Sequence, residues 1–272
     1  MNAKTEMFRN RLVKVFRHLG KQAAKQGISC YRVYDHDLPE FPFSIEFYGE
    51  RLYMAEYRRN HHLSDEEHQA QLDAVLQIVS EVLQVQVSAI FLKERKRKED
   101  RKSQYEKLGE GGSFFTVEEQ GLKFLVNLED YLDTGLFTDH RITRQMVRQE
   151  AQNKHVLNLF CYTGSFSVYA AAGGAASVTS IDMSNTYTHW AKQNMQLNGL
   201  YHEEQHQFIR ADVLQHLHQL PRNHYELVIL DPPTFSNSKM MNDFFEVQQH
   251  HTLLINNLLH TMKTGGIMYF ST

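Results

Sequence analysis

The first hundred residues combine helical and strand-like patterns of apolar positions. Apolar residues spaced three and four apart predict a helix of about five turns on Phe8, Leu12, Val15, Phe16 and Leu19. Short apolar runs predict strands at 29–34, 43–48, 51–57 and 85–92. A turn at Gly49-Glu50 joins two of them as a hairpin, and the capping box of Ser64 and Glu67 opens a second helix. This region is therefore expected to form an α+β unit with its own small core.

From residue 155 the pattern changes to strands that alternate with helices. Buried strands are expected at 155–160, 176–181, 207–210, 225–230 and 266–270. Helices are expected between them at 166–172, 184–197, 213–220 and 247–262. Because neighbouring parallel strands need right-handed crossovers, this order predicts an α/β fold with a doubly wound, Rossmann-like sheet.

A charged, glycine-ending stretch and a predicted hairpin within residues 114–128 separate the two halves. We therefore divide the chain into an N-terminal α+β domain at 1–108, a β-hairpin connector at 109–133 and the doubly wound domain at 134–272.

Acidic residues stand at three expected strand ends, where ligands of doubly wound sheets bind. Asp182 is placed to accept from both hydroxyls of a ribose, and Asp212 to receive an exocyclic amine. For each aspartate alone, a helix N-cap is the favoured explanation, but their occurrence together with Gly164 favours a ligand site. The fourth strand runs directly into Asp231-Pro232-Pro233-Thr234-Phe235, where the prolines hold an extended loop and an aromatic ring follows.

The loop after the first of these strands disfavours two common nucleotide sites. A dinucleotide fold needs G-x-G-x-x-G at this point, and only Gly164 fits. A phosphate-binding G-K-[ST] occurs nowhere in the sequence. One glycine in a tight turn still admits a neutral nucleoside or an amino acid.

Composition and charge narrow the class of protein further. Hydrophobic residues make up 42% of 272, yet no apolar run approaches eighteen residues and no secretory signal opens the chain, so a cytoplasmic location is expected. Cys30 and Cys161 are too few for a zinc cluster. The histidine pairs 61/62, 216/218 and 250/251 are adjacent or two apart, spacings that point the side chains apart on a helix, so no metal is expected. Net charge is −3, but residues 1–26 carry +6 and residues 93–102 carry +4. Runs this short are most simply solvated helix faces unless a nucleic-acid site lies nearby.

The strand-end residues resemble those of class I S-adenosylmethionine-dependent methyltransferases. Residues 133–141, reading Asp-Thr-Gly-Leu-Phe-Thr-Asp-His-Arg, together with 158–167, 180–184 and 231–235, are similar to the large-subunit rRNA methyltransferases of the cytosine-C5 and guanine-N7 group. Within that group, Cys30 to Glu40 resembles the C-terminal, guanine-N7-modifying half of bifunctional 23S rRNA methyltransferases, whose other half methylates guanine N2. The resemblance covers nearly the whole chain.

The resemblance implies S-adenosylmethionine as cofactor, with the ribose on Asp182 and the adenine near Asp212. The implied cofactor contacts are Asp139, Arg141, Asn158, Phe160, Tyr162, Thr163, Gly164, Ser165, Asp182, Met183, Asp212, Val213 and Asp231. The implied catalytic, base-facing residues are Asp231, Pro232, Pro233 and Phe235.

The implied partner is 23S rRNA, with no membrane and no metal. Sheets of this class continue past the fifth strand into an antiparallel hairpin, whereas this sequence stops at Thr272. We therefore expect further sheet strands, and a fused or associated guanine-N2 methyltransferase domain, outside this chain.

The chemistry favours guanine N7 as the target and leaves cytosine C5 as an alternative. N7 carries an exposed lone pair and no proton, so alignment in a water-poor site suffices, with Phe235 as candidate stacker and Asp231 as positioning group. Cytosine C5 needs a thiolate that first attacks the ring, and neither Cys30 nor Cys161 lies on the base-facing loops. The C5 enzymes of the group that this sequence resembles carry a cysteine just after the fifth strand. This sequence ends at that point.

A hypothesis of another class is a noncatalytic RNA-binding module that keeps a cofactor-type fold. The two basic segments support it. The carboxylates at three strand ends argue against it, because binding RNA alone does not require them.

Overall fold

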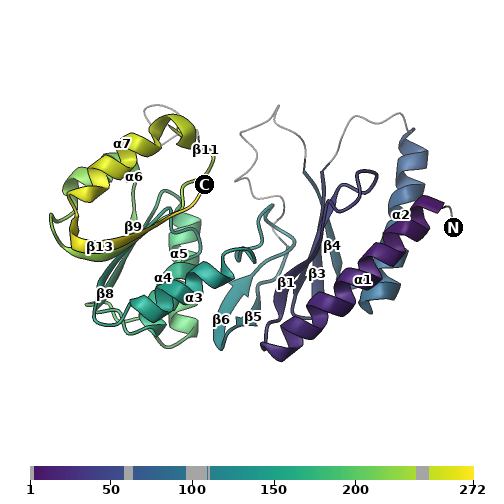
Figure 1. The fold of residues 1–272 in the computed structure, drawn as a ribbon, viewed down its shortest axis with the longest axis horizontal. Coiled ribbons are helices and arrows are strands. Elements are labelled where there is room, and N and C mark those ends of the chain that lie inside the picture. The colour runs from purple at the N-terminus through teal and green to yellow at the C-terminus, as the bar shows by residue number, and fades with distance from the viewer. Residues whose placement is uncertain (1–2, 58–63, 96–108, 110, 237–244) are drawn as a thin grey trace. The chain divides into compact units, whose positions relative to one another are not determined.

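The computed structural model describes residues 3–57, 64–95, 109, 111–236 and 245–272 (Figure 1). The chain divides into two compact units, residues 1–121 with 126–139, and residues 122–125 with 140–272. We call them unit 1 and unit 2. No helix in the described ranges is long and apolar enough to cross a membrane.

Unit 1 is a four-stranded sheet covered on one face by two helices. Its elements are α1 (Ala3–Lys25), β1 (Cys30–Asp35), β2 (Phe43–Tyr48), β3 (Arg51–Tyr57), α2 (Asp65–Leu83) and β4 (Ile90–Arg95). The strands follow the order β1-β2-β3-β4, with β4 parallel to β3 and the other pairs antiparallel. Phe8 and Leu12 of α1 join the apolar side of α2 in a single core over the sheet. The predicted α+β domain is therefore confirmed.

The turn and the helix cap predicted from the sequence are found at the predicted residues. Gly49 turns the β2–β3 hairpin with φ +64°, and the predicted capping box of Ser64 and Glu67 opens α2. The strand predicted at 85–92 is shifted, because a short 3₁₀ turn at Val87–Ala89 precedes β4.

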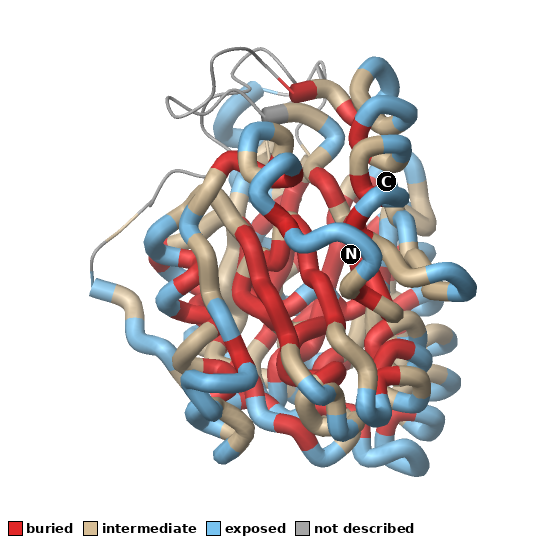
Figure 2. Tube along the Cα trace, turned by 90° about the vertical axis from the view of Figure 1, so that its left-hand side faces the viewer, coloured by how far each residue is buried: buried red, intermediate tan, exposed pale blue. Residues whose placement is uncertain are grey.

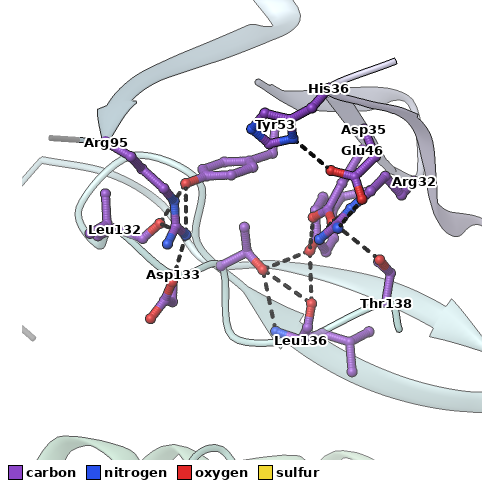
Figure 3. A network of polar contacts seen from close by, with 12 residues as sticks. Arg32, Asp35, His36, Glu46, Tyr53, Arg95, Leu132, Asp133, Leu136 and Thr138 are labelled. Atoms are coloured by element: carbon purple, nitrogen blue, oxygen red, sulfur yellow. Dashed lines mark hydrogen bonds and ion pairs between the residues drawn. The ribbon is translucent and has the colours of Figure 1, made fainter. Parts of the chain in front are cut away.

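A polar network fastens residues 132–138 to the sheet of unit 1 (Figure 3). The buried Tyr48 hydroxyl donates to the Leu136 carbonyl at 2.7 Å. Arg95, the last residue of β4, forms an ion pair with Asp133, with 2.7 Å between the guanidinium and the carboxylate. Buried polar groups destabilise a fold unless they are paired, so these contacts fix the path of the chain through residues 132–138.

Unit 2 contains a five-stranded parallel sheet in the order β13-β10-β7-β8-β9. Its strands are β7 (His155–Leu159), β8 (Ser177–Asp182), β9 (His206–Arg210), β10 (Tyr225–Leu230) and β13 (Met262–Phe270). Its helices are α3 (Arg141–Glu150), α4 (Ser165–Ala172), α5 (Asn185–Leu197), α6 (Val213–His216) and α7 (Val247–Leu259). This arrangement confirms the predicted doubly wound fold.

The helices of unit 2 cover both faces of the sheet. One core joins Val147 of α3 and Phe166 of α4 to the strands, and another joins Val213 of α6 and Leu254 of α7 to the opposite face. The central strands are accordingly buried along most of their length, as the red segments of Figure 2 show. Two-sided burial explains the nearly continuous apolar runs in the sequence.

Three predictions for unit 2 need correction. The helix α3 was not expected, because its buried face includes Arg144, a residue type that normally indicates solvent. The helix predicted at 213–220 stops at His216 and continues as a 3₁₀ turn. The helix predicted to reach residue 262 ends at Leu259, and β13 begins at Met262 rather than Gly266.

The predicted hairpin is formed by β5 (Phe115–Glu119) and β6 (Leu122–Val126). Residues 122–125 belong to unit 2, where side chains of α5 hold them. Asn194 Oδ1 accepts from the Leu125 amide at 2.8 Å, and the Trp190 indole donates to the Leu125 carbonyl at 3.0 Å. Trp190 is itself buried.

Candidate active site

The candidate site of unit 2 lies at the carboxyl ends of its strands. The order of the strands reverses between β7 and β10, because the chain runs outward from β7 to β9 and then returns to β10. Ligands of doubly wound sheets bind at such a switch point. The loops that follow β7, β8, β9 and β10 carry most of the residues that the sequence singled out.

The loop after β7 has an unusual backbone. Phe160, Tyr162 and Gly164 have φ values of 55°, 50° and 73°, in the left-handed region that is unfavourable for residues other than glycine. Each such non-glycine residue costs on the order of 1 to 3 kcal/mol and persists only where its surroundings hold it. The Cys161 amide donates to the Ile181 carbonyl at 3.0 Å, which ties the loop to β8. The result is a tight turn between β7 and α4, held against β8.

Gly164 is required by both conformation and space. A Cβ added at this position would lie 2.7 Å from the Cβ of Ala191 on α5, closer than two carbon atoms can approach. The loop therefore lies directly against α5. Ser165 follows as the first residue of α4, while Thr163 is buried and its carbonyl accepts from Asn194 at 2.8 Å.

Asp182 connects the loops after β7 and β8. Its Oδ2 accepts from the Tyr162 amide and its Oδ1 from the Ser184 amide, both at 2.9 Å. Burial raises the pKa of Asp182 to about 6, although these backbone donors oppose the increase. Ser184, not Asp182, is the N-cap of α5, so the N-cap alternative for Asp182 is wrong. A carboxylate that is half-buried at a strand end has the character of a ligand-binding group.

Asp212 differs from Asp182, because the N-cap alternative is correct for it. Its Oδ1 accepts from the Leu214 amide and its Oδ2 from the Gln215 side chain, both at 3.0 Å. Val213 is buried in the core of unit 2. The adenine contact predicted for these two residues stays a prediction, since Leu214 and Gln215 already engage both oxygens of the Asp212 carboxylate.

A series of buried side-chain hydrogen bonds links the strands and the helix on either side of the loop after β7. Asn158 donates from Nδ2 to the Ser167 hydroxyl at 2.8 Å, and that hydroxyl lies 2.7 Å from the hydroxyl of Ser180. Asn158 is 1% exposed, so it joins α4 to β7 and β8. On the next loop, the Met183 carbonyl accepts from Arg210 at 3.3 Å. The predicted cofactor contacts of Asn158 and Met183 are not tested by these bonds.

The Asp231-Pro-Pro loop leaves β10 at the switch point. Oδ1 of Asp231 accepts from the hydroxyl of Ser271, and Oδ2 lies 3.9 Å from Nε2 of His140. Phe235 lies in the short strand β11 (Phe235–Ser236), which pairs with β12 (Phe245–Glu246). The structure thus places Asp231 next to two side chains, His140 and Ser271, that the sequence reasoning did not assign.

The segment before α3 is divided between the units. Asp139 is the exposed last residue of unit 1, and Arg141 is the first residue of α3 in unit 2. Their predicted contacts with the cofactor stay predictions. His140, between them, could have been found only by the positions of its neighbours in space, because a lone histidine in sequence indicates nothing.

Neither thiol is poised as a nucleophile. Cys30 and Cys161 are both buried, and neither forms a disulfide. Burial and the neighbouring Asp182 raise the pKa of the Cys161 thiol well above its usual value, which keeps the sulfur protonated. Among the described residues, no three His, Cys, Asp or Glu side chains gather as a metal site requires.

Comparison with known proteins decides the family. Residues 62–269 match the family model of S-adenosylmethionine-dependent methyltransferases. The chain belongs to this family. The resemblance seen in the sequence is therefore confirmed, and S-adenosylmethionine is the cofactor of this methyltransferase.

Among its relatives, this methyltransferase is 47% identical over 266 residues to ribosomal RNA large subunit methyltransferase K of Neisseria meningitidis, covering 97% of this chain and 75% of that protein. It is 47% identical over 273 residues to ribosomal RNA large subunit methyltransferase K/L of Methylococcus capsulatus, covering 98% of this chain and 37% of that protein. The chain thus spans just over a third of the length of the K/L proteins.

A solved structure shows the same fold. The methyltransferase SMU.776, crystallised in complex with SAH, superposes with a TM-score of 0.74 at 24% identity, covering 96% of this chain and 66% of that one. At this level of identity the likeness concerns the fold, which combines a small N-terminal sheet domain with a five-stranded parallel sheet.

Proposed function

We propose that this methyltransferase transfers a methyl group from S-adenosylmethionine to N7 of a guanine in 23S rRNA. The observation that carries the proposal is the identity of 47% along nearly the whole chain to a ribosomal RNA large subunit methyltransferase K. Family membership also replaces the hypothesis of a noncatalytic binding module.

The site is suited to a target atom that carries an exposed lone pair and no proton, as guanine N7 does. Transfer from a sulfonium is an in-line displacement, so the enzyme supplies alignment and excludes water. Asp231 follows β10 at the switch point, and Phe235 follows it by four residues. In the proposed complex the Phe235 ring stacks on the flipped-out guanine, and the Asp231 carboxylate accepts from its ring N–H.

Cytosine C5 is the less favoured target on the described residues. That reaction needs a thiolate that attacks the ring, and the Cys161 thiol is buried and protonated. Cys30 lies in β1 of unit 1, buried within that unit.

We propose that α1 of the N-terminal domain, residues 1–108, contacts the RNA backbone. Lys14, Arg17, Lys21 and Lys25 are exposed and recur every three or four residues, so they share one side of the helix. Two other basic side chains of α1 are engaged, Arg9 with Glu81 and Arg11 with Asp37.

The second basic segment contributes less than its sequence predicts. Lys93 donates to the Glu129 carbonyl, and Arg95 is paired with Asp133. Residues 96–102 lie outside the described residues. Within the described residues, the proposed RNA surface is therefore the stripe on α1 alone.

The deciding experiment identifies the methylated nucleoside. The chain is incubated with 23S rRNA and methyl-labelled S-adenosylmethionine, and the digested RNA is analysed by mass spectrometry. N7-methylguanine is expected, and its cationic ring makes the RNA cleavable by reduction followed by aniline. Labelled 5-methylcytosine, or labelled RNA that resists this cleavage, would reject the N7 proposal in favour of the C5 alternative.

Variants of the proposed residues complete the test. Phe235→Ala removes a stacking contact worth about 1 to 3 kcal/mol, so turnover on RNA should fall while SAH affinity stays unchanged. Replacing Lys14, Arg17, Lys21 and Lys25 with Gln should flatten the dependence of RNA binding on salt, because fewer counterions are released. Replacing the paired Arg9 and Arg11 is the matched control and should leave the slope nearly unchanged.

A further inference from the structure

One side chain beside Asp231 has no role in the function proposed so far. The imidazole of His140 points toward the Asp231 carboxylate, with 3.9 Å between Nε2 and Oδ2. His140 comes from the N-terminus of α3 and Asp231 from the end of β10, so two distant parts of the sequence of unit 2 bring them together. Both side chains remain partly exposed, 26% for His140 and 32% for Asp231, and a ligand can reach them.

The position of His140 is fixed from two sides. Its ring lies 5.8 Å from the ring of Phe166 on α4, at an angle of 58°. Its carbonyl accepts from the amide of Arg144 at 2.8 Å, in the first turn of α3. Arg144 is itself 1% exposed, with its guanidinium 5.8 Å above the ring of Tyr169. The turn that carries His140 is thus anchored by a buried residue.

Asp231 is also fixed, but only through one of its oxygens. Ser271 donates its hydroxyl to Oδ1, and the Ser271 amide donates to the Leu230 carbonyl at 3.1 Å. In the part of the chain that the structure describes, no hydrogen bond ends on Oδ2. The carboxylate is therefore oriented with one acceptor still open, on the side that faces His140.

The gap between His140 and Asp231 is too wide for a hydrogen bond between them. An N–H···O bond is about 2.7 to 3.2 Å long, and these atoms are 3.9 Å apart. Both the neutral Nε2–H tautomer and the imidazolium carry a hydrogen on Nε2, while the carboxylate can only accept. The two side chains therefore present a donor and an acceptor side by side, each able to bond to a third group.

We infer that His140 and Asp231 read the Watson–Crick edge of the target guanine, with Nε2–H of His140 donating to O6 and Oδ2 of Asp231 accepting from N1–H. The inference rests on the proposed function and adds a specificity-determining residue to it. Guanine offers an acceptor and a donor on adjacent atoms of this edge. Adenine offers the reverse order, so the same pair places donor against donor and rejects it.

This way of holding the base agrees with the proposed chemistry. N7 belongs to the five-membered ring, on the edge away from N1, so contacts to N1–H and O6 leave its lone pair free for the methyl group. A site that hydrogen-bonds a substrate discriminates strongly against analogues that lack the group, because its own polar atoms are then left unpaired.

The test uses the full chain and synthetic RNAs that carry guanine, inosine or 2-aminopurine at the mapped target position. All three bases keep N7. Inosine keeps O6 and N1–H, and 2-aminopurine lacks both. The unmodified enzyme should methylate the inosine RNA nearly as well as the guanine RNA, and the 2-aminopurine RNA at least about a hundredfold less efficiently in kcat/KM.

Substitution of His140 separates recognition from folding. His140→Ala should raise KM for guanine RNA by about tenfold to a hundredfold, the effect of one hydrogen bond, and should narrow the preference for guanine over 2-aminopurine. SAH affinity should not change, because the inference assigns His140 to the base and not to the cofactor. His140→Gln keeps an N–H donor and should restore part of the preference. His260→Ala, at the exposed end of α7, is the matched histidine control.

The outcomes distinguish this inference from the function on which it rests. If the unmodified enzyme forms no N7-methylguanine, the proposed function is wrong and the inference fails with it. If it forms N7-methylguanine but treats inosine and 2-aminopurine alike, or if His140→Ala keeps the full preference for guanine, the function stands and the inference is overturned. The comparison of the three bases requires no variant, so it remains decisive even if His140→Ala fails to fold.

Discussion

The affinity for the cofactor should depend on pH through Asp182. Burial raises the pKa of this carboxyl group from its ordinary value of 3.8 to about 6. Only the ionised form can accept from both hydroxyls of a ribose. With a pKa of about 6, the ionised fraction falls from about nine-tenths at pH 7 to about one-tenth at pH 5. The association constant for SAH should therefore fall about tenfold over this range, equivalent to about 1.4 kcal/mol.

Isothermal titration calorimetry with SAH at pH 5, 6 and 7 measures this dependence. The matched control is Asp182→Asn, which should bind more weakly at pH 7 and show no step near pH 6. An unchanged affinity between pH 5 and 7 would refute the assignment of Asp182 to the ribose. An equal slope in Asp182→Asn would refute it as well, because another group would then be titrating.

The same pKa shift acts on the stability of the unliganded protein in the opposite direction. A group whose pKa is raised on folding binds its proton more tightly in the folded state. Its contribution to stability is thus fully present below pH 3.8 and is lost as the pH rises through about 6. As the pH falls from 6 to 4, the contribution of Asp182 to the stability of the apoprotein should therefore increase while the affinity for SAH decreases. Thermal denaturation of the unmodified protein and Asp182→Asn across this range isolates the contribution.

Three further predictions concern single residues. Gly164→Ala should destabilise unit 2 by about 1 to 3 kcal/mol and weaken SAH binding, because the added methyl group meets Ala191; chemical denaturation and calorimetry measure the two effects. Tyr48→Phe should lower the free energy of unfolding by about 1 to 3 kcal/mol, since the buried Leu136 carbonyl keeps only the longer contact from the Thr134 hydroxyl, at 3.2 Å; a change below the error of the urea midpoint would contradict the role given to the network. Cys161→Ser should leave methyl transfer to RNA intact, and a complete loss of transfer in a folded variant would indicate covalent catalysis.

Local patterns were sufficient to predict the elements that bury a regular apolar face. The strands of the parallel sheet are apolar because both of their faces are covered, and α2 is marked by the capping box at Ser64. The helix α3 was missed because Arg144 lies in its buried face, where its guanidinium lies over the ring of Tyr169. A sequence pattern contains no information about such a partner in space.

The candidate site was predictable to a similar extent. The strand-end positions of Asp182 and Asp231 follow from the order of strands and helices alone. The difference between Asp182 and Asp212 does not, because both precede a helix and only the structure shows which carboxylate caps it. His140 approaches Asp231 through a crossing of distant segments, which no spacing along the chain encodes.

The close approach of Gly164 to Ala191 also limits how this protein can evolve. Ala191 is completely buried, and its Cβ occupies the space that any side chain at position 164 would need. A larger residue at position 191 would press on the loop after β7 even while Gly164 is retained. Substitution at either position therefore requires a shift of α5. The residue at position 164 thus restricts which residues position 191 can accept, and the reverse also holds. Across related sequences, position 191 should accept only glycine or alanine wherever position 164 remains glycine.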